Sequence, residues 1–221
     1  MSIAFISDLH LEPVDNDRLH SFINFLVEAP DKYKSLYIIG DLFEYWVGDD
    51  DPHPINELIQ NKIKDTIGQG LSIYFIHGNR DFLLGSEFEK NTGLRIIDDM
   101  TVIKDSGISL MIAHGDSFCT DDIEYQALKK SLRSAEWKKD FLQKPIAERI
   151  AFADDLRAKS AESSSNKAEN IMDVNQSYVA EVIEKHKIDF LIHGHTHRPA
   201  IHKLDNGLSL IHISEPTRPY L

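Results

Sequence analysis

The 221-residue sequence has little cysteine, few basic residues and no long apolar segment, and each deficit excludes a class of protein. Its one cysteine, Cys119, cannot form an intramolecular disulfide, which excludes a disulfide-stabilised scaffold. Lys and Arg number 24 against 36 Asp and Glu, and the net charge of −12 argues against a general nucleic-acid binder, which needs clustered cations. Apolar runs are too short to cross a bilayer, and the first residues lack a signal peptide's basic start. These features favour a soluble, cytosolic chain.

Five short apolar segments recur along the chain and are rich in Ile, Leu, Phe and Tyr. They span residues 3–6, 36–39, 73–76, 110–113 and 190–192. Because they are continuously apolar, we expect strands that are covered on both faces. Apolar residues with helical spacing occupy the segments 19–26 and 55–67 between them. This alternation is typical of βαβ units and predicts an α/β fold.

The stretch from about residue 118 to residue 170 interrupts the alternation. Its apolar residues have helical spacing, and residues 119–167 contain ten Lys or Arg and nine Asp or Glu, a net of +1 in a chain of net −12. We interpret it as a helical insertion. Each large apolar residue in it is typical of core packing when taken alone. As a set mixed with lysines, these residues would suit a helical lid on an anionic membrane surface.

Every predicted strand is followed at once by side chains that can bind a metal ion. In chain order these are Asp8, His10, Asp41, Asn79, His114, His195 and His197. Because the carboxyl ends of parallel strands meet at one edge of a sheet, we expect the seven to converge. Imidazole, carboxylate and amide donors without thiolates suit Mn²⁺, Fe²⁺ or Zn²⁺ and argue against a structural zinc site. Seven ligands predict two ions that share a carboxylate, an arrangement that catalyses displacement at phosphorus.

Each motif also has an ordinary structural interpretation when taken alone. Asp-x-His and His-x-His pairs are often surface residues, and Gly-Asp and Gly-Asn pairs are typical of turns. The metal hypothesis depends on all five motifs occurring at strand ends. Chance is a far weaker explanation than a shared metal site, since all five motifs would have to fall at the same sheet edge.

The motif order Asp-x-His, Gly-Asp, Gly-Asn-Arg-Asp, His-Gly and Gly-His-x-His resembles that of the calcineurin-like metallophosphoesterases. Longer motifs resemble the UDP-2,3-diacylglucosamine hydrolase (pyrophosphatase) family of lipid A biosynthesis over about residues 3–205. They lie at residues 40–51, 75–85, 114–122, 171–175 and 193–200. The resemblance implies a four-layer αββα metallophosphoesterase sandwich, residues 1–207, with the insertion as a lid.

The same resemblance implies a hydrolase. Its substrate would be UDP-2,3-diacylglucosamine, its products 2,3-diacylglucosamine 1-phosphate (lipid X) and UMP, and the attacking water would be activated by two Mn²⁺ ions, with Fe²⁺ or Zn²⁺ as alternatives. The expected partners are this substrate and an anionic membrane, without nucleic acid. The protein would be peripheral, at the cytoplasmic face of the inner membrane.

The residues of the site follow from matching the motifs of the family. One metal would take Asp8, His10, Asp41 and His197, and the other would take Asp41, Asn79, His114 and His195. The implied catalytic residues are Asp41, Asn79, Arg80, His114 and His195. The implied substrate contacts are Asn79, Arg80, Asp122, Ser160, Ser164, Lys167 and His195.

Arg80 follows a predicted ligand, and its guanidinium suits phosphate oxygens. Its alternative role is a salt bridge to Asp81. Because an arginine does not donate its proton, the sequence leaves the general acid unassigned, although a phosphate leaving group needs less proton help than an alkoxide.

Two other functions stay open at this point. One is a general metallophosphoesterase acting on nucleotides or other phosphoesters, and the other is a catalytically inactive scaffold of the same fold. Retention of all seven ligand positions argues against the scaffold.

The tail, residues 208–221, resembles none of the endings of the family. It is similar to the translation of a transposase adapter used in DNA sequencing libraries. We therefore expect that it is not native family sequence, and His212 is not proposed as a ligand.

Overall fold

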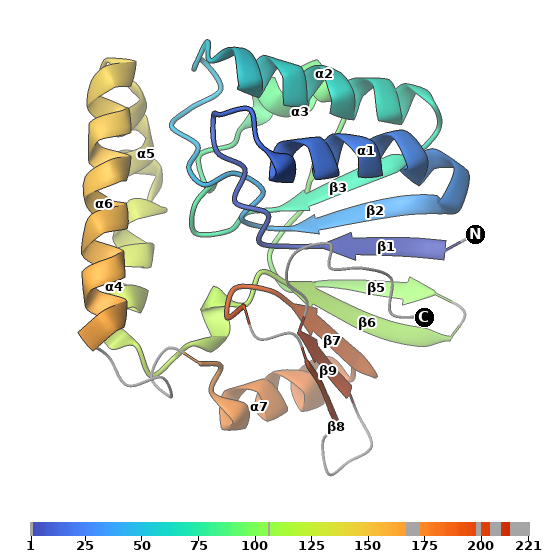
Figure 1. Ribbon diagram of the computed structural model, residues 1–221. Coiled ribbons are helices and arrows are strands. Elements are labelled where there is room, and N and C mark those ends of the chain that lie inside the picture. The colour runs from blue at the N-terminus through green and yellow to red at the C-terminus, as the bar shows by residue number, and fades with distance from the viewer. Residues whose placement is uncertain (1, 106, 167–172, 198–199, 204–208, 213–221) are drawn as a thin grey trace.

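Two β-sheets lie face to face at the centre of the molecule (Figure 1). The computed structural model describes residues 2–105, 107–166, 173–197, 200–203 and 209–212. The first sheet is parallel and contains, in spatial order, β1 (Ser2–Ile6), β2 (Tyr33–Ile39), β3 (Ser72–Ile76) and β4 (Arg95–Ile96). The strands predicted at 3–6, 36–39 and 73–76 are confirmed.

The second sheet contains, in spatial order, β5 (Thr101–Asp105), β6 (Ile108–Ala113), β7 (Phe190–His193), β9 (Ser209–His212) and β8 (Ala200–Lys203). Its inner strands β6, β7 and β9 are parallel, and each outer strand is antiparallel to its neighbour. The strands predicted at 110–113 and 190–192 lie here. Residues 209–212 of the unusual tail supply β9, and the tail from residue 213 onward lies outside the described residues.

Helices cover the outer faces of both sheets (Figure 1). The first sheet packs against α1 (Asp17–Lys32), α2 (Pro54–Gly68) and α3 (Ser86–Thr92), and the second against α7 (Gln176–His186). Between the sheets lie Ile39, Ile76, Ile112 and Ile192. These layers explain the continuous apolarity of the five predicted strands, because each of them is covered by a helix on one face and by the other sheet on the other.

Helix α1 shows how the sequence forms these layers. Leu19, Phe22 and Leu26 lie on one buried stripe, and burial of such a side chain stabilises the fold by about 1.5–3 kcal/mol. The side chain of Asn16 caps the helix by accepting a hydrogen bond from the Leu19 N–H at 2.9 Å.

Of the helices that the structure describes, none combines the length and apolarity that a membrane span requires.

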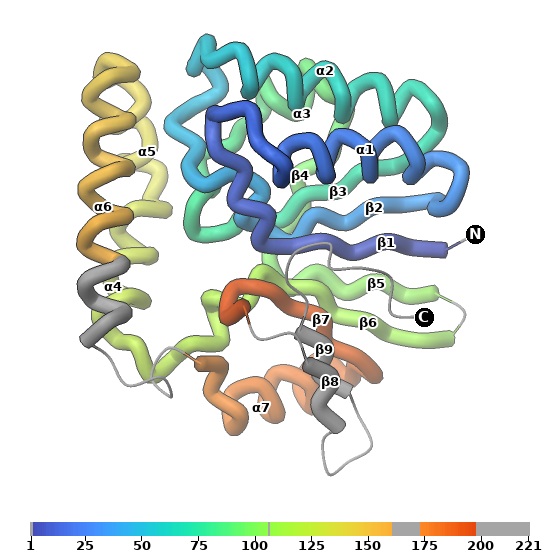
Figure 2. The backbone as a smooth tube through the Cα atoms, viewed as in Figure 1, coloured from blue at the N-terminus to red at the C-terminus, as the bar shows by residue number. Residues whose placement is uncertain are grey.

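The predicted insertion is a group of three helices, α4 (Ile123–Leu132), α5 (Ala135–Leu142) and α6 (Ile146–Asn166). They stand beside the carboxyl ends of β1, β2 and β3 (Figures 1 and 2). Phe141 belongs to the core of the first sheet, so core packing is confirmed for this residue. The buried Arg149 donates to the Val47 carbonyl oxygen at 2.7 Å and pairs with Asp50. The insertion is therefore anchored to the body of the protein by both apolar and ionic contacts.

Candidate metal centre and adjoining pocket

The seven residues predicted as metal ligands meet just beyond the carboxyl ends of β1, β2, β3, β6 and β7. Ligand atoms of Asp8, His10 and His197 lie within 4.8 Å of one another, and so do those of Asp8, Asp41 and His114. The Asn79 Oδ1 atom lies 3.0 Å from His114 Nε2 and 2.9 Å from His195 Nδ1. Asn79 and His195 therefore belong to the same cluster.

The backbone of the cluster is strained. Five of its residues have positive φ angles, namely Asp8 (56°), His10 (47°), Asp41 (51°), His195 (73°) and His197 (53°). Among the other non-glycine residues of the described chain, only Met100 and Lys187 share this conformation. It costs of order 1–3 kcal/mol per residue and persists where surrounding contacts impose it, typically at functional sites.

Two glycines allow these turns to approach one another. A Cβ atom on Gly78 would collide with the Asp41 carboxylate, and one on Gly194 would collide with the side chains of Ser7 and Asp8. Both positions therefore need a residue without a side chain, because the ligand turns pack directly against their backbone.

The orientation of His114 favours a cation. Its Nδ1 lies 3.0 Å from the Ile39 carbonyl oxygen, so we assign the donated proton to Nδ1. In the neutral ring, the lone pair of Nε2 then faces Asn79 Oδ1 at 3.0 Å and Asp41 Oδ2 at 3.8 Å. Three electron-rich atoms face one another, and either a proton or a metal ion would relieve their repulsion.

His10 repeats this arrangement on the other side of Asp41. Its Nδ1 lies 2.9 Å from Glu44 Oε2, which leaves Nε2 facing Asp41 Oδ2 at 3.8 Å and His197 Nε2 at 3.1 Å. Asp41 therefore lies between two groups of donor atoms. The donor set fits two divalent cations that share this carboxylate.

The pKa values of the cluster reflect the same crowding. Burial lowers the pKa of His114, but the carboxylates of Asp41, Asp116 and Asp8 outweigh it and raise this pKa to about 9. Burial raises the pKa of Asp41, although His114 and His10 oppose the shift. Burial, with the nearby His114, lowers the pKa of His195 to about 3, so that its imidazole is neutral at physiological pH. The centre attracts positive charge and keeps one neutral imidazole.

Residues 1–199 match the model of the family described as calcineurin-like phosphoesterase. The chain belongs to this family. It is 44% identical over 204 residues to proteins named UDP-2,3-diacylglucosamine hydrolase from Escherichia coli O7:K1 (strain IAI39 / ExPEC) and Escherichia fergusonii. These matches cover 92% of this chain and 85% of each relative.

Solved structures that resemble this phosphoesterase are more distant in sequence. An archaeal phosphodiesterase is 17% identical with a TM-score of 0.49, and the match covers 97% of this chain and 84% of that one. A dimetal phosphatase from Danio rerio is 12% identical with a TM-score of 0.49, with 96% and 87% covered.

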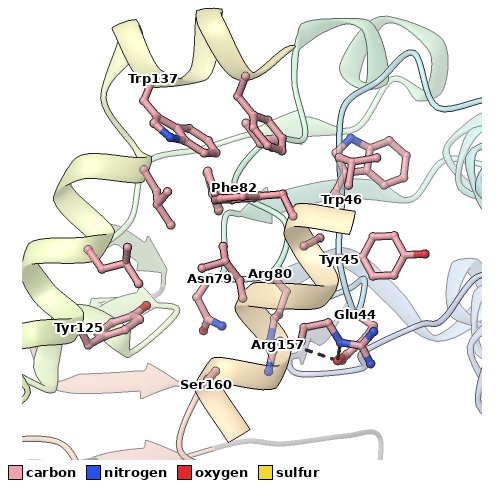
Figure 3. Close-up of a pocket in the computed structure, with 18 residues that line it drawn as sticks. Glu44, Tyr45, Trp46, Asn79, Arg80, Phe82, Tyr125, Trp137, Arg157 and Ser160 are labelled. Carbon is pink, nitrogen blue, oxygen red and sulfur yellow. Dashed lines mark ion pairs between the residues drawn. The ribbon is translucent and has the colours of Figure 1, made fainter. Parts of the chain in front are cut away.

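A pocket opens between the candidate metal centre of the phosphoesterase and its inserted helices (Figure 3). Asn79, Arg80, Tyr125 and Ser160 lie at one end, and Phe82 and Trp137 lie toward the other. Further apolar side chains complete the wall, among them Leu83, Leu128, Leu132, Phe141, Phe152 and Leu156. The pocket thus joins a polar end beside the metal centre to an apolar chamber.

Arg80 does not pair with Asp81, so this alternative is wrong for the described structure. The Asp81 carboxylate instead accepts hydrogen bonds from the backbone N–H groups of Leu42 and Gly78, each at 2.8 Å. The Arg80 guanidinium lies 3.8 Å from Glu44, and its side chain lines the pocket. Arg80 is therefore positioned to meet an anion in the pocket.

The other predicted substrate contacts have different positions. Asn79, Arg80 and Ser160 line the pocket, and His195 lies under the Tyr125 ring with 6.1 Å between centroids. Asp122 is the N-cap of α4, where it accepts from the Tyr125 N–H at 3.1 Å, and it is not among the described residues that line the pocket. Lys167 and the side chain of Ser164 lie outside the described residues, so their roles stay predictions.

Three buried or half-buried acids around the centre are not among the site residues predicted from the sequence. Glu44 contacts His10 and also pairs with Arg157 at 2.8 Å. Asp81 holds the turn of Asp41, and burial, with the nearby Asp41, raises the Asp81 pKa to about 6. Asp116 pairs with Lys129 of α4 and with Arg133 at the C-cap of that helix. All three lie inside or next to the recognised motifs, which is the signal that could have identified them.

Proposed function

We propose that this phosphoesterase hydrolyses the pyrophosphate bond of UDP-2,3-diacylglucosamine in lipid A biosynthesis, giving UMP and 2,3-diacylglucosamine 1-phosphate. The observation that carries the proposal is a continuous pocket that connects the candidate metal centre to an apolar chamber, since this substrate joins a charged uridine diphosphate group to a sugar that carries two acyl chains. The name of the relatives at 44% identity supports the same substrate. A general nucleotide hydrolase has no need of the apolar chamber, and a scaffold has no need of the strained ligand cluster.

We infer two divalent cations, one held by Asp8, His10, Asp41 and His197 and the other by Asp41, Asn79, His114 and His195. Mn²⁺ is the proposed metal, and Fe²⁺ or Zn²⁺ would accept the same donors. Such ions, when bound, activate water and stabilise negative charge at phosphorus. The fit rests on the lone pairs that face one another around Asp41.

Arg80 would hold the pyrophosphate. Its Nε atom is buried and has no hydrogen-bond partner among the described residues, so the guanidinium has donor capacity for phosphate oxygens. The water oxygen would attack the phosphorus joined to uridine, and the bond from that phosphorus to the bridging oxygen would break. The sugar 1-phosphate would leave as an anion beside Arg80, and such a phosphate leaving group needs less proton help than an alkoxide.

The acyl chains would occupy the chamber between Phe82 and the inserted helices. Trp137 stacks on Phe141 there, and Phe152 packs against both rings at tilted angles, so the three present a preformed apolar wall. Each methylene group buried against such a wall contributes about 0.8 kcal/mol to binding. The chamber would therefore discriminate strongly against a sugar nucleotide that lacks acyl chains.

The proposed activity is tested by incubating the purified protein with Mn²⁺ and UDP-2,3-diacylglucosamine in ¹⁸O-labelled water, with product analysis by mass spectrometry. We expect UMP and 2,3-diacylglucosamine 1-phosphate, with the label in UMP. UDP-N-acetylglucosamine is the matched control without long acyl chains, and we expect little turnover of it. Equal turnover of both would support the general hydrolase, and metal uptake without turnover of either would support the scaffold.

We also propose that the inserted helices dock on an anionic membrane surface. Ile123 is 76% exposed and Leu142 is 40% exposed, and lysines on the same helices, such as Lys130 and Lys139, are exposed as well. Exposed apolar side chains mixed with lysines are typical of segments that lie on anionic lipid.

Vesicle sedimentation tests this docking. We expect the protein to bind vesicles rich in phosphatidylglycerol more tightly than neutral vesicles, and the double variant Ile123→Glu/Leu142→Glu to lose about tenfold or more in partitioning, because the buried apolar area is lost and negative charge is added. Val27→Glu is the matched control, since Val27 is 60% exposed on α1, outside the insertion. Equal losses for the control and the double variant would contradict docking through the insertion.

A further inference from the structure

A buried carboxylate outside the predicted ligand set connects the metal centre to helix α4. Asp116 has no exposed surface and begins a short 3₁₀ helix two residues after His114. The Tyr125 hydroxyl donates to Asp116 Oδ2 at 2.8 Å, Lys129 Nζ lies 2.9 Å from Oδ1, and Arg133 Nη2 lies 3.3 Å from Oδ2. Three side chains of α4, or of its C-cap in the case of Arg133, therefore converge on one carboxylate.

The partners of Asp116 are spaced along most of α4, so they hold the whole helix and not only one of its turns. Tyr125, Lys129 and Arg133 are separated by four residues each, so they form a single stripe along α4. Gln126 adds a hydrogen bond from its Nε2 to the Asp116 carbonyl oxygen at 2.8 Å. Residues along most of α4 thus contact a single residue, Asp116, in the turn that follows His114.

Both ends of the stripe also touch the reaction site directly. The Tyr125 ring stacks on the His195 ring at an interplanar angle of 28°, and Arg133 Nη2 donates to the carbonyl oxygen of Gly78 at 2.8 Å, next to Asn79. Between these contacts α4 presents Leu128 and Leu132 to the apolar chamber. The position of the chamber wall relative to the metal centre therefore depends on how α4 is held.

We propose that Asp116 is a positioning residue for substrate binding. It holds α4 against the turns of His114 and Gly78. The apolar chamber, which α4 helps to line, therefore keeps a fixed distance and orientation relative to the polar end of the pocket. The inference rests on the proposed function for its substrate. Asp116 itself lies behind Tyr125 with no exposed surface, and it acts through the helix rather than by touching the substrate.

The test compares Asp116→Asn with Lys129→Met, which weakens the same contact from the helix side. The Lys129 ammonium group also donates to Ser117 Oγ at 2.6 Å, so Lys129→Met removes a second contact between α4 and the same turn. Steady-state kinetics are measured with UDP-2,3-diacylglucosamine and with bis(p-nitrophenyl) phosphate, a diester that has no acyl chains. For both variants we expect KM for the lipid to rise at least about tenfold, the effect of losing one buried interaction with a charged group. For Lys129→Met we expect kcat/KM for the small diester and the bound metal content to stay within about twofold of wild type. Asp116→Asn also removes a charge that acts on His114, so for this variant we expect only that the lipid substrate loses more than the small diester.

A loss of fold would give a different pattern, because fewer active molecules lower turnover of both substrates equally. Thr66→Val is the matched control for stability: Thr66 is buried on α2, its hydroxyl donates to backbone carbonyls, and it lies outside the site. We expect it to lower Tm without separating the two substrates. Equal loss on both substrates, or unchanged lipid KM in both Asp116→Asn and Lys129→Met, would overturn the proposal.

Hydrogen exchange gives a readout that needs no substrate. Amides of residues 123–132 are expected to exchange faster in Asp116→Asn than in wild type, while those of α2 are unchanged. Unaltered exchange in α4 would refute the anchoring. Wild-type protein that cleaves the diester but not the lipid would refute the proposed function, and the exchange measurement would still decide the role of Asp116.

Discussion

Replacement of Asp41 by asparagine is expected to lower kcat/KM by about a thousandfold or more, because it removes several kcal/mol of metal-dependent stabilisation. Asp41 is 2% exposed, and its Oδ2 lies 3.8 Å from both His10 Nε2 and His114 Nε2, between the two groups of donor atoms. The amide keeps the size of the side chain and removes its charge, so two cations would lose the ligand that they share. Metal content by mass spectrometry and steady-state kinetics would measure the effect.

A matched control for Asp41→Asn is Asp49→Asn. The Asp49 carboxylate accepts hydrogen bonds from the backbone N–H groups of Gly85 at 3.0 Å and Phe88 at 3.1 Å, but it does not belong to the metal cluster. We expect this variant to be less stable and to retain its metal. An Asp41→Asn protein with a full metal complement and near wild-type turnover would exclude Asp41 as the bridging ligand.

The convergence of the ligands was predictable because two simple rules combine at this site. The segment before Asp41 and the segment before His195 are short and continuously apolar, which predicts buried strands. Parallel strands place the residues that follow them at one sheet edge, and the structure shows that Asp8 accepts hydrogen bonds from the His195 N–H. The pattern of the sequence therefore indicated which residues meet, although it could not supply distances.

The support around the ligands was not predictable in the same way. Tyr125, Lys129 and Arg133 form a recognisable stripe in the sequence, but that stripe does not reveal which carboxylate it meets. The answer depends on how α4 is placed against the sheets, which is decided by long-range packing. For the same reason, the sequence left open whether Phe141 lines a lid or the core, and the structure places it in both the core and the pocket wall.

Metal affinity is expected to fall about tenfold for each pH unit between pH 8 and pH 6, about a hundredfold in total, because His114 must lose a proton before its Nε2 can bind a cation. Burial lowers the His114 pKa, but the surrounding carboxylates outweigh it and raise it to about 9, so before a metal binds this imidazole is protonated throughout that range. Proton and metal compete for the same atom, and acid therefore favours the proton. The raised pKa of Asp41 acts in the same direction.

Calorimetric titration with Mn²⁺ at several pH values, each in two buffers of different ionisation enthalpy, would measure both the affinity and the protons released. We expect close to one proton released per chain from His114 at pH 7 to 8. His20→Asn is the matched control, because His20 is an exposed histidine that pairs with Asp15 at 2.8 Å, away from the centre, and its loss should leave the pH dependence unchanged. An affinity that stays constant from pH 8 to pH 6 would mean that the His114 imidazole does not bind the metal, and the second cation would then lack a ligand whose ring is oriented by the Ile39 carbonyl oxygen.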